Sequence, residues 1–586
     1  MWSNTGYLVT DQRSKTNSMP EDIVPLFRLP NFRDEPLLNW FLLYFPVGTM
    51  RLICDATNDN ARTIAWAHDR RWKFLRVGEF MRWLGMWILM TIYGAQNSNR
   101  RAYWGPLLNF GRFMSLNRFE CILRAFKLPQ YAKDDTKWGG DGAVEYAGIR
   151  YDKFQETRKF ADMCRRLFQD AMKPGGWICI DECMFSWLGR VLKLPGWKII
   201  KRKPHPMGLE SKTTACSVTG MLIDFEFQEG KDVMRHFEFI EETNKSSAWL
   251  LRLTKRWHNM EKRTVIADAA FAQVRAAVAL YKIGGLYLIG NVKGARKYFP
   301  KAALKNETPA YERDELVCMT KQADVRIRDD ETLTVYATGW RATGAMVCTY
   351  VHTGGTNGVG SDRVKRKFAL TDDGKTHEST CHVKRPKVSS EYQSKMGAID
   401  EHNSRRQSAR GIRPLEKVCI TRDTKDRIFI NLVSWMLINV YLAKKFFVWN
   451  GQMRKSHSEV QESIAMALIH NNRYAEETGA NAGDEDGNDS DNDVINDPDD
   501  CVRHPNYKGN TCKLCGQRRT VYFCRVCSTP KTPTQRANTG PKGGQKLQHG
   551  GYMHFCKGRC FMMHKCGEVP TRKKRANPAQ GVDFCI

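Results

Sequence analysis

Three aspartates follow short apolar segments, and carboxylates in such positions can hold metal ions. Asp181 follows Trp177–Ile180, Asp268 follows Thr264–Ala267, and Asp400 follows a third apolar stretch far down the chain. Short β-branched runs closed by a polar residue predict buried strands, so the first two carboxylates are expected at the rim of a sheet. Three carboxylates gathered there repel one another unless a cation lies among them, and their oxygens suit Mg²⁺. Two such ions about 3.5–4 Å apart can activate a water and stabilise the leaving oxygen of a phosphodiester.

A single Asp after a strand is usually a solvated turn residue, so the order of the surrounding elements carries the argument. Between the first two aspartates, the alternation of residues predicts a hairpin of Thr213–Val218 with Met221–Phe227. A helix over Ser247–Asn259 follows, and after the second aspartate come another helix and the strand Leu286–Ile289. An RNase H-like core has this order, with acids on its first and fourth strands and on a later helix, where Asp400 stands. We therefore expect an α/β fold with an RNase H-like catalytic core.

Several blocks of residues along the chain carry a family resemblance. They are Glu79–Phe80 with Gly85–Tyr93 and Tyr103–Trp104, Met114–Phe119 with Leu123–Arg124, Ile180–Glu182 with Gly189–Arg190, Lys203–Pro206 with Gly208 and Asp224–Phe225, and Lys384–Val388 with Tyr392 and Met396–Asp400. In this order the blocks resemble the transposases of the piggyBac superfamily. The resemblance covers about residues 29–443 and the cysteine-rich tail.

The resemblance implies a DNA transposase that cuts and rejoins DNA at TTAA sites. Its catalytic triad would be Asp181, Asp268 and Asp400, which would hold two Mg²⁺ ions. The implied partners are double-stranded DNA, namely transposon ends and the TTAA target, and a second copy of the chain in a homodimer. The chain departs from the family at Ala269–Ala270, where an Asn and an aromatic are common, and at Asn403, where a further acid often lies. An amide brings no charge, so weaker metal affinity is expected.

The C-terminal cysteines are spaced like zinc ligands, with two Cys-x2-Cys corners and a Cys-x3-Cys pair followed by a histidine. The eight expected ligands are His504, Cys512, Cys515, Cys524, Cys527, Cys556, Cys560 and His564, which would fill two tetrahedral Zn²⁺ sites. The pairing of corners stays open, and Cys501, His549, His554 and Cys566 are alternative ligands. The segment is too small and polar to fold by burial alone, so zinc would supply its stability. The family uses such a domain to grip transposon ends.

Composition and charge agree with a DNA-binding protein that works inside the cell. The 586 residues carry a formal net charge of +29, which favours a polyanionic partner. No apolar signal stretch opens the chain, and the apolar segments at 83–93 and 428–442 are too short to span a bilayer comfortably. We expect no membrane partner, and the 19 cysteines are expected as thiols or metal ligands rather than disulfides. Basic clusters at 363–367 and 572–575 are candidate import signals for the nucleus.

Changes of composition along the chain divide it into successive predicted segments. They are a disordered N-terminus (1–28), a helical dimerisation and DNA-binding region (29–174), the first part of the RNase H-like core (175–300), a β-containing insertion domain (301–379), the part of the core with the third aspartate (380–409), a helical region that packs on the N-terminal helices (410–475), an acidic disordered linker (476–500), a cysteine-rich zinc domain (501–570) and a basic tail (571–586). The linker has almost no apolar residues and cannot support a core.

Two other functions fit parts of the sequence. A domesticated or decayed descendant of a transposase would bind DNA without cutting it. A RING-type ubiquitin ligase would use the cysteine-rich tail, but that function leaves the three aspartates unexplained. Inverted repeats bounded by TTAA on both sides of the coding region would favour a mobile element.

Overall fold

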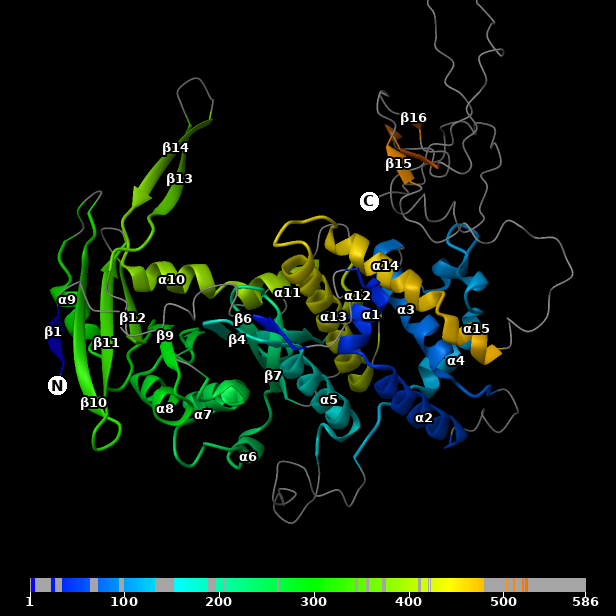
Figure 1. Ribbon diagram of the computed structural model, residues 1–586, viewed down its shortest axis with the longest axis horizontal. Coiled ribbons are helices and arrows are strands. Elements are labelled where there is room, and N and C mark those ends of the chain that lie inside the picture. Colours follow the sequence, from blue (N-terminus) through cyan, green and yellow to red (C-terminus); the bar gives the residue numbers. More distant parts are fainter. Residues whose placement is uncertain are drawn as a thin grey trace, which may run out of the picture.

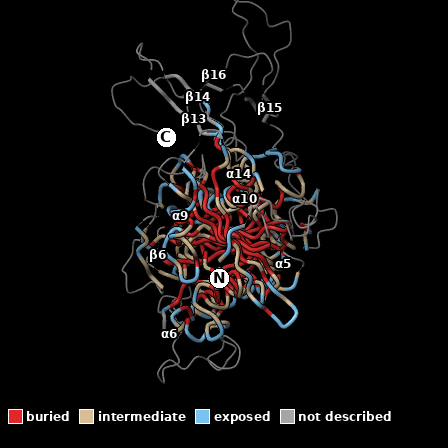
Figure 2. The backbone as a smooth tube through the Cα atoms, turned by 90° about the vertical axis from the view of Figure 1, so that its left-hand side faces the viewer, coloured by how far each residue is buried: buried red, intermediate tan, exposed pale blue. Residues whose placement is uncertain are grey.

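The protein is seen here as a computed structural model. Its described residues are 2–5, 23–26, 34–63, 72–93, 100–131, 152–187, 196–201, 203, 206–260, 263–310, 312, 315–342, 346–354, 358–370, 376–408, 413–419, 421, 423–478, 501–503, 510–511, 519–520 and 522–524. Within them, a large sheet extends from the middle of the molecule to one end, and most helices gather at the other end (Figure 1). Buried residues concentrate along the centre, with exposed residues around the periphery (Figure 2).

The central sheet has ten strands in the order β1–β10–β11–β12–β9–β8–β4–β6–β5, with β7 beside β6. Its strands are β1 (Ser3–Thr5), β4 (Trp177–Ser186), β5 (Trp197–Ile199), β6 (Met207–Cys216), β7 (Leu222–Phe227), β8 (Thr264–Ala267), β9 (Tyr287–Asn291), β10 (Cys318–Arg326), β11 (Thr332–Arg341) and β12 (Val347–Thr353). Strands β4, β8 and β9 are parallel neighbours, and the other pairs are antiparallel. The predicted α/β fold therefore rests on a mixed sheet.

Strand β4 continues past the point where the sequence predicted its end. The apolar run closes at Ile180, but β4 extends to Ser186. Antiparallel pairing with β6 covers the whole stretch from Ile178 to Ser186, and the strand persists because of that partner. Asp181 therefore lies within a strand, and the prediction that it ends one is wrong.

The predicted insertion joins the core sheet directly. Strand β12 pairs with β9 from Tyr350 opposite Asn291 to His352 opposite Ile289. Strands β10 and β11 extend the same sheet, and β13 (Arg363–Leu370) forms a separate hairpin with β14 (Thr376–Val383). The core and the inserted strands thus share one backbone hydrogen-bond network. Displacing the inserted strands would break the backbone hydrogen bonds between β12 and β9, and β9 is the neighbour of β8.

Two helices that the sequence predicts occur between β7 and β9 in the order of the chain, with slightly different bounds. Helix α7 spans Lys245–Thr254 and continues as a short 3-10 turn, and α8 spans Val274–Gly284. Gly285 ends α8 with a left-handed φ of 64°, a conformation that glycine adopts without steric penalty. Short helices α6 (Lys231–Met234) and α9 (Lys301–Glu307) flank them, and α10 (Lys387–Lys395) precedes α11 (Ala398–Ser408).

The remaining helices form a body around α13 (Thr424–Ala443), which is buried along almost its whole length. They are α1 (Leu37–Tyr44), α2 (Val47–Thr63), α3 (Val77–Tyr93), α4 (Leu116–Ala125), α5 (Gln155–Ala171), α12 (Leu415–Val418), α14 (His457–Ile469) and α15 (Asn472–Thr478), with 3-10 turns at Arg100–Trp104 and Phe110–Arg112. The rings of Phe45, Phe160 and Phe429 contact one another, with 5.4–6.2 Å between their centroids. Phe429 belongs to α13, so these contacts pack α13 against the N-terminal helices. The residue that caps the end of α1 and residues of α5 and α13 thus share one aromatic cluster.

One described helix and one bent helix pair are apolar enough to cross a membrane, and the N-terminus joins the central sheet. Among the described residues, Thr424–Val448 is long and apolar enough to cross a membrane, but 94% of its most apolar stretch is buried within the protein. The adjacent helices α1 and α2 also pass that composition test only as a pair, which is bent by 63°. Near the start, β1 pairs with β10, and Trp2 packs edge-on against Phe299, so part of the segment expected to be disordered forms an edge strand of the sheet.

Short strands outside the central sheet pair among themselves towards the chain's two ends. Near the start, β2 (Val24–Pro25) pairs with β3 (Met172–Lys173). In the C-terminal segment, β15 (Cys501–Arg503) pairs with β18 (Tyr522–Cys524), and β16 (Asn510–Thr511) pairs with β17 (Arg519–Thr520). Helix α15 includes residues 476–478, so the first three residues of the predicted disordered linker (476–500) are helical; the rest of the linker and the basic tail lie outside the described residues.

Candidate active site

Parallel pairing of β4 with β8 places Asp181 and Asp268 side by side. The last paired residues are Ile180 and Ala267, and each aspartate comes directly after its member of that pair. Strand β8 ends there while β4 continues, so the edge of β4 loses its neighbour where the two carboxylates emerge. Carboxyl ends of parallel strands are where open α/β sheets bind their ligands.

The loop after Asp268 is held in place by close packing and by side-chain hydrogen bonds. A Cβ atom at Gly290 of β9 would lie 2.7 Å from the Ala272 side chain, so only glycine allows this approach. Ser246 of α7 donates to the Ala270 carbonyl at 3.2 Å, and Arg296 donates to the Ala269 carbonyl at 2.7 Å. Asp268 therefore leaves the sheet on a fixed backbone.

Helix α11 brings Asp400 to the same place from far down the chain. Two thiols of β4 bond to this segment: Cys179 donates to the Met396 carbonyl at 3.2 Å, and Cys183 donates to the Asn403 side-chain oxygen at 2.8 Å. The two cysteines lie two residues before and after Asp181, so all three side chains share one face of the strand. Asp400 lies between the two contact points and is exposed.

The electrostatics of Asp181 show that the three carboxylates act on one another. The pKa of Asp181 is raised to about 6, chiefly by burial and to a smaller extent by the charges of Asp400 and Asp268. The ammonium group of Lys203 and a hydrogen bond from the Glu182 backbone N–H oppose this rise. Negative charge is therefore concentrated where the three chain segments meet, and a cation would relieve it.

Cations surround this cluster on two sides. Lys203 donates to the Glu182 carbonyl at 3.2 Å, and the Lys293 ammonium lies 3.7 Å from one oxygen of Asp268. Lys203 stands in one of the blocks that carry the family resemblance, but no local pattern in the sequence places it next to Asp181. Lys293 carried no signal in the sequence, because only the turn after β9 brings it beside Asp268.

The donor set suits a hard divalent cation, since it consists of carboxylates, one of them buried, on rigid elements. Among the described residues, however, no three His, Cys, Asp or Glu side chains lie close enough to hold a metal ion as they stand. Asp268 lies toward Lys293, while Asp181 accepts a hydrogen bond from its own strand. The residues thus fit magnesium by chemistry and by position in the fold, although their side chains are not gathered at ligand distance.

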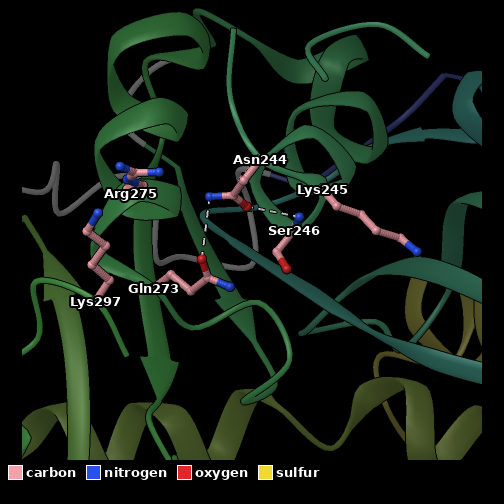
Figure 3. A pocket seen from close by; sticks show the side chains of 6 residues that line it. All are labelled: Asn244, Lys245, Ser246, Gln273, Arg275 and Lys297. Atoms are coloured by element: carbon pink, nitrogen blue, oxygen red, sulfur yellow. Dashed lines mark hydrogen bonds between the residues drawn. The ribbon is translucent and has the colours of Figure 1, made fainter. Parts of the chain in front are cut away.

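A basic pocket of about 360 Å³ lies behind the loop that follows Asp268. Its lining residues come from the starts of α7 and α8 and from the turn after β9, and they are Asn244, Lys245, Ser246, Gln273, Arg275 and Lys297. Figure 3 shows Asn244 between the two helix starts, bonded to Gln273 on one side and to the Ser246 backbone on the other. Three of the six lining side chains are cations and none is an acid, so the pocket suits an anion such as a phosphate.

Two cations of this pocket lie close together without a carboxylate partner. Arg275 donates to the Tyr298 hydroxyl at 3.2 Å, and both Arg275 and Lys297 lie 5.1 Å from the centroid of that ring. Within the described part of the chain, no carboxylate lies at salt-bridge distance from either cation. No local pattern in the sequence indicates this pocket, because its residues come from three separate segments and belong to no motif.

All but one of the predicted zinc ligands lie outside the described residues. Cys524 lies in the short strand β18, and the other predicted ligands, His504, Cys512, Cys515, Cys527, Cys556, Cys560 and His564, lie outside the described residues. The zinc sites therefore stay predictions from the sequence.

Comparison with known proteins gives two findings. The family model of transposase IS4 matches residues 38–441. The cryo-EM structure of a piggyBac transposase synaptic complex with hairpin DNA is similar in fold, with a TM-score of 0.53 and 16% sequence identity. That similarity covers 86% of this chain and 98% of the other. No curated protein matches the chain.

Proposed function

This chain belongs to the transposase IS4 family and is a DNA transposase by that membership, and we propose that Asp181, Asp268 and Asp400 carry its DNA cleavage and strand transfer. The observation that supports this proposal best is the convergence of the three carboxylates. They come from a strand, the end of a parallel strand and a distant helix, and the charges of the other two raise the pKa of Asp181.

Asp181, Asp268 and Asp400 would hold two Mg²⁺ ions. Such ions, when bound, activate a water or a 3′-hydroxyl and stabilise the departing oxygen of the phosphodiester. The protein's own contribution is to hold the carboxylates on rigid backbone and to place cations around the phosphate. Lys203 and Lys293 flank the cluster and would neutralise part of the charge of a DNA strand that enters it.

The basic pocket extends this surface away from the carboxylates. Ser246 joins the pocket wall to the loop after Asp268, so a strand seated at the cluster would pass close to Arg275 and Lys297. We propose that the pocket takes a backbone phosphate of the bound DNA. Such contacts position the duplex without reading its sequence.

The finer parts of the proposal rest on the sequence resemblance. They are cutting and insertion at TTAA sites, a homodimer that brings two transposon ends together, work in the nucleus, and a C-terminal domain in which two Zn²⁺ ions support the grip on the transposon ends. The piggyBac transposase of similar fold forms a synaptic complex with hairpin DNA, which agrees with a DNA partner of this kind.

A second candidate is a transposase-derived protein that binds DNA without cutting it. Asn403 favours this function, because it stands where the family often has a further acid.

A cleavage assay with the purified full-length chain separates the two candidates. The substrate is a duplex with the element's own terminal sequence flanked by TTAA, and cleavage is followed with Mg²⁺ and with chelator. Mg²⁺-dependent nicking that Asp181→Asn abolishes supports the nuclease. If the wild type binds DNA tightly but does not nick it over a wide range of Mg²⁺ concentrations, the result supports the second candidate, a protein that binds DNA without cutting it.

A further inference from the structure

Helix α11 is fixed to the sheet beyond Asp400 by one buried side chain, Arg406. Its guanidinium donates to the Met184 carbonyl of β4 at 2.6 Å and to the Cys183 sulfur at 3.8 Å. The same group donates to Glu416 of α12 at 2.9 Å and to the Asn431 side-chain oxygen of α13. One arginine thus ties the helix that carries Asp400 to the strand that carries Asp181.

The partners of Arg406 are themselves held. Asn431 donates to the Arg427 carbonyl at 2.8 Å, and Arg427 donates to the Glu416 carbonyl at 2.6 Å. Side chains of Arg406 and Glu416 are only 1% and 2% exposed, so this network is screened from water. In a low-dielectric interior such a network allows one arrangement and penalises others.

Stability alone does not explain a charged pair at this position. The Arg406 Nε and one oxygen of Glu416 are buried without a hydrogen-bond partner in the described part of the chain. Burying two charges requires removing their water, and well-packed apolar residues often stabilise a core equally well or better. An apolar pair, however, cannot bond to the Met184 carbonyl. The arginine also fixes the orientation of α11 relative to β4, because the N–H groups of its planar guanidinium donate in set directions.

We propose that Arg406 is a positioning residue that sets Asp400 beside Asp181 for cation binding. The inference rests on the proposed function of the three aspartates. Arg406 lies six residues past Asp400, or about 9 Å along the helix, and does not touch the carboxylates itself. Its effect passes through α11, which the Cys183 contact holds at Asn403, one turn beyond Asp400, while the Cys179 contact holds Met396 just before the helix begins. Outer contacts of this kind alter metal affinity or activity by about 10–100-fold.

Two variants separate positioning from mere support of the fold. Arg406→Met combined with Glu416→Leu removes both charges together and leaves no buried ion unpaired. Arg406→Lys keeps the charge opposite Glu416 but lacks the fork that also reaches Met184. A matched control is Arg252→Met with Glu226→Leu, because that pair is also largely shielded from water, and Arg252 likewise donates to a backbone carbonyl, that of Glu238.

The test measures Mn²⁺ binding to the full-length chain by electron paramagnetic resonance, counting the site that Asp181→Asn removes. We expect the Arg406 variants to melt near the wild-type temperature, to bind DNA with unchanged affinity and to bind Mn²⁺ about 10–100-fold more weakly. The control pair should keep wild-type Mn²⁺ affinity. In the cleavage assay, kcat at fixed low Mg²⁺ should fall while KM for DNA holds.

Each other outcome decides the matter as well. Wild-type Mn²⁺ affinity in either folded variant overturns the inference, and so does a wild-type chain without an Asp181-dependent Mn²⁺ site. If both variants unfold, Arg406 serves the fold, and the inference falls. A wild type that binds Mn²⁺ at this site but does not cut DNA defeats the proposed function, while the metal affinities still decide the role of Arg406.

Discussion

The thiol of Cys183 on β4 donates a hydrogen bond to the side-chain oxygen of Asn403 on α11, across 2.8 Å. Cys183 is buried and Asn403 is half-buried, so the contact lies at the interface of strand and helix. Position 403 departs from the family pattern, in which an acid is common, and the structure gives its amide a partner. A carboxylate there could accept the same hydrogen bond and would add a negative charge one turn beyond Asp400.

We therefore expect Asn403→Asp to lower the Mg²⁺ concentration needed for half-maximal cleavage. The added charge favours the bound cation, and the Cys183 contact keeps the side chain in place. Mg²⁺ titrations of cleavage by the two proteins measure the effect, with Asn403→Leu as the control that removes the acceptor. Equal midpoints for wild type and Asn403→Asp would mean that position 403 does not influence the metal.

Replacing the central carboxylates should remove cleavage and spare DNA binding. Asp181→Asn and Asp268→Asn keep the shape of the side chain but remove the charge that would hold Mg²⁺. The loss should exceed about 100-fold, the upper effect of a residue that only supports a metal ligand. Glu182→Gln is the control, because Glu182 faces the other way and pairs with Lys212 at 2.7 Å. Near wild-type nicking by either aspartate variant would show that this aspartate is not needed for cleavage and would contradict the proposed triad.

The basic pocket should contribute to the salt dependence of DNA binding. Proteins that neutralise several phosphates lose roughly 10³–10⁵ in affinity between 50 and 200 mM salt. Arg275→Gln and Lys297→Gln should each reduce the slope of log affinity against log salt by about 1. Lys282→Gln, at the far end of α8, serves as the control with an equal loss of charge. Identical slopes for all three variants would remove the pocket from the DNA path.

Glu462 on α14 should make stability depend on pH. Burial, and then the charge of Glu459, raise its pKa from 4.5 to about 7, and one of its oxygens is buried without a partner in the described part of the chain. The folded protein holds this proton more tightly than the unfolded chain does. The associated stability is therefore fully present below about pH 4.5 and is lost as pH rises through 7.

Glu462→Gln removes this titration. We expect it to raise the free energy of unfolding at pH 8 by about 3 kcal/mol, at about 1.4 kcal/mol for each pH unit between 4.5 and 7, and to change little at pH 4.5. Urea unfolding at both pH values measures the difference. As a control, Asp59→Asn at an exposed site should change the free energy of unfolding by the same amount at both pH values. A gain at pH 8 no larger than at pH 4.5 would contradict the burial of the charged form.

The C-terminal segment should carry zinc. Eight ligands fill two tetrahedral sites, so the purified full-length chain should contain two Zn²⁺ ions, and Cys527→Ser should release one of them. Elemental analysis after dialysis measures the content. Cys121→Ser changes a free thiol of α4 and should leave the zinc in place. A zinc-free wild type purified without chelator would refute the prediction.

Local patterns in the sequence were enough to find the elements that carry the site. The hairpin of β6 and β7 and the helices α7 and α8 all follow from periodicity and turn residues. These signals are short-range, because side-chain alternation and backbone preference depend on near neighbours. The same signals singled out the three aspartates, and the family resemblance then gave them a role.

Only the tertiary structure decided how those elements meet. Pairing with β6 carries β4 past Asp181 while β8 stops at Ala267, and pairing with β9 joins the inserted strands to the core. The basic pocket and the contacts of Arg406 join segments far apart in the chain. Strand pairing and buried polar contacts depend on partners distant in sequence, so local propensity carries no record of them.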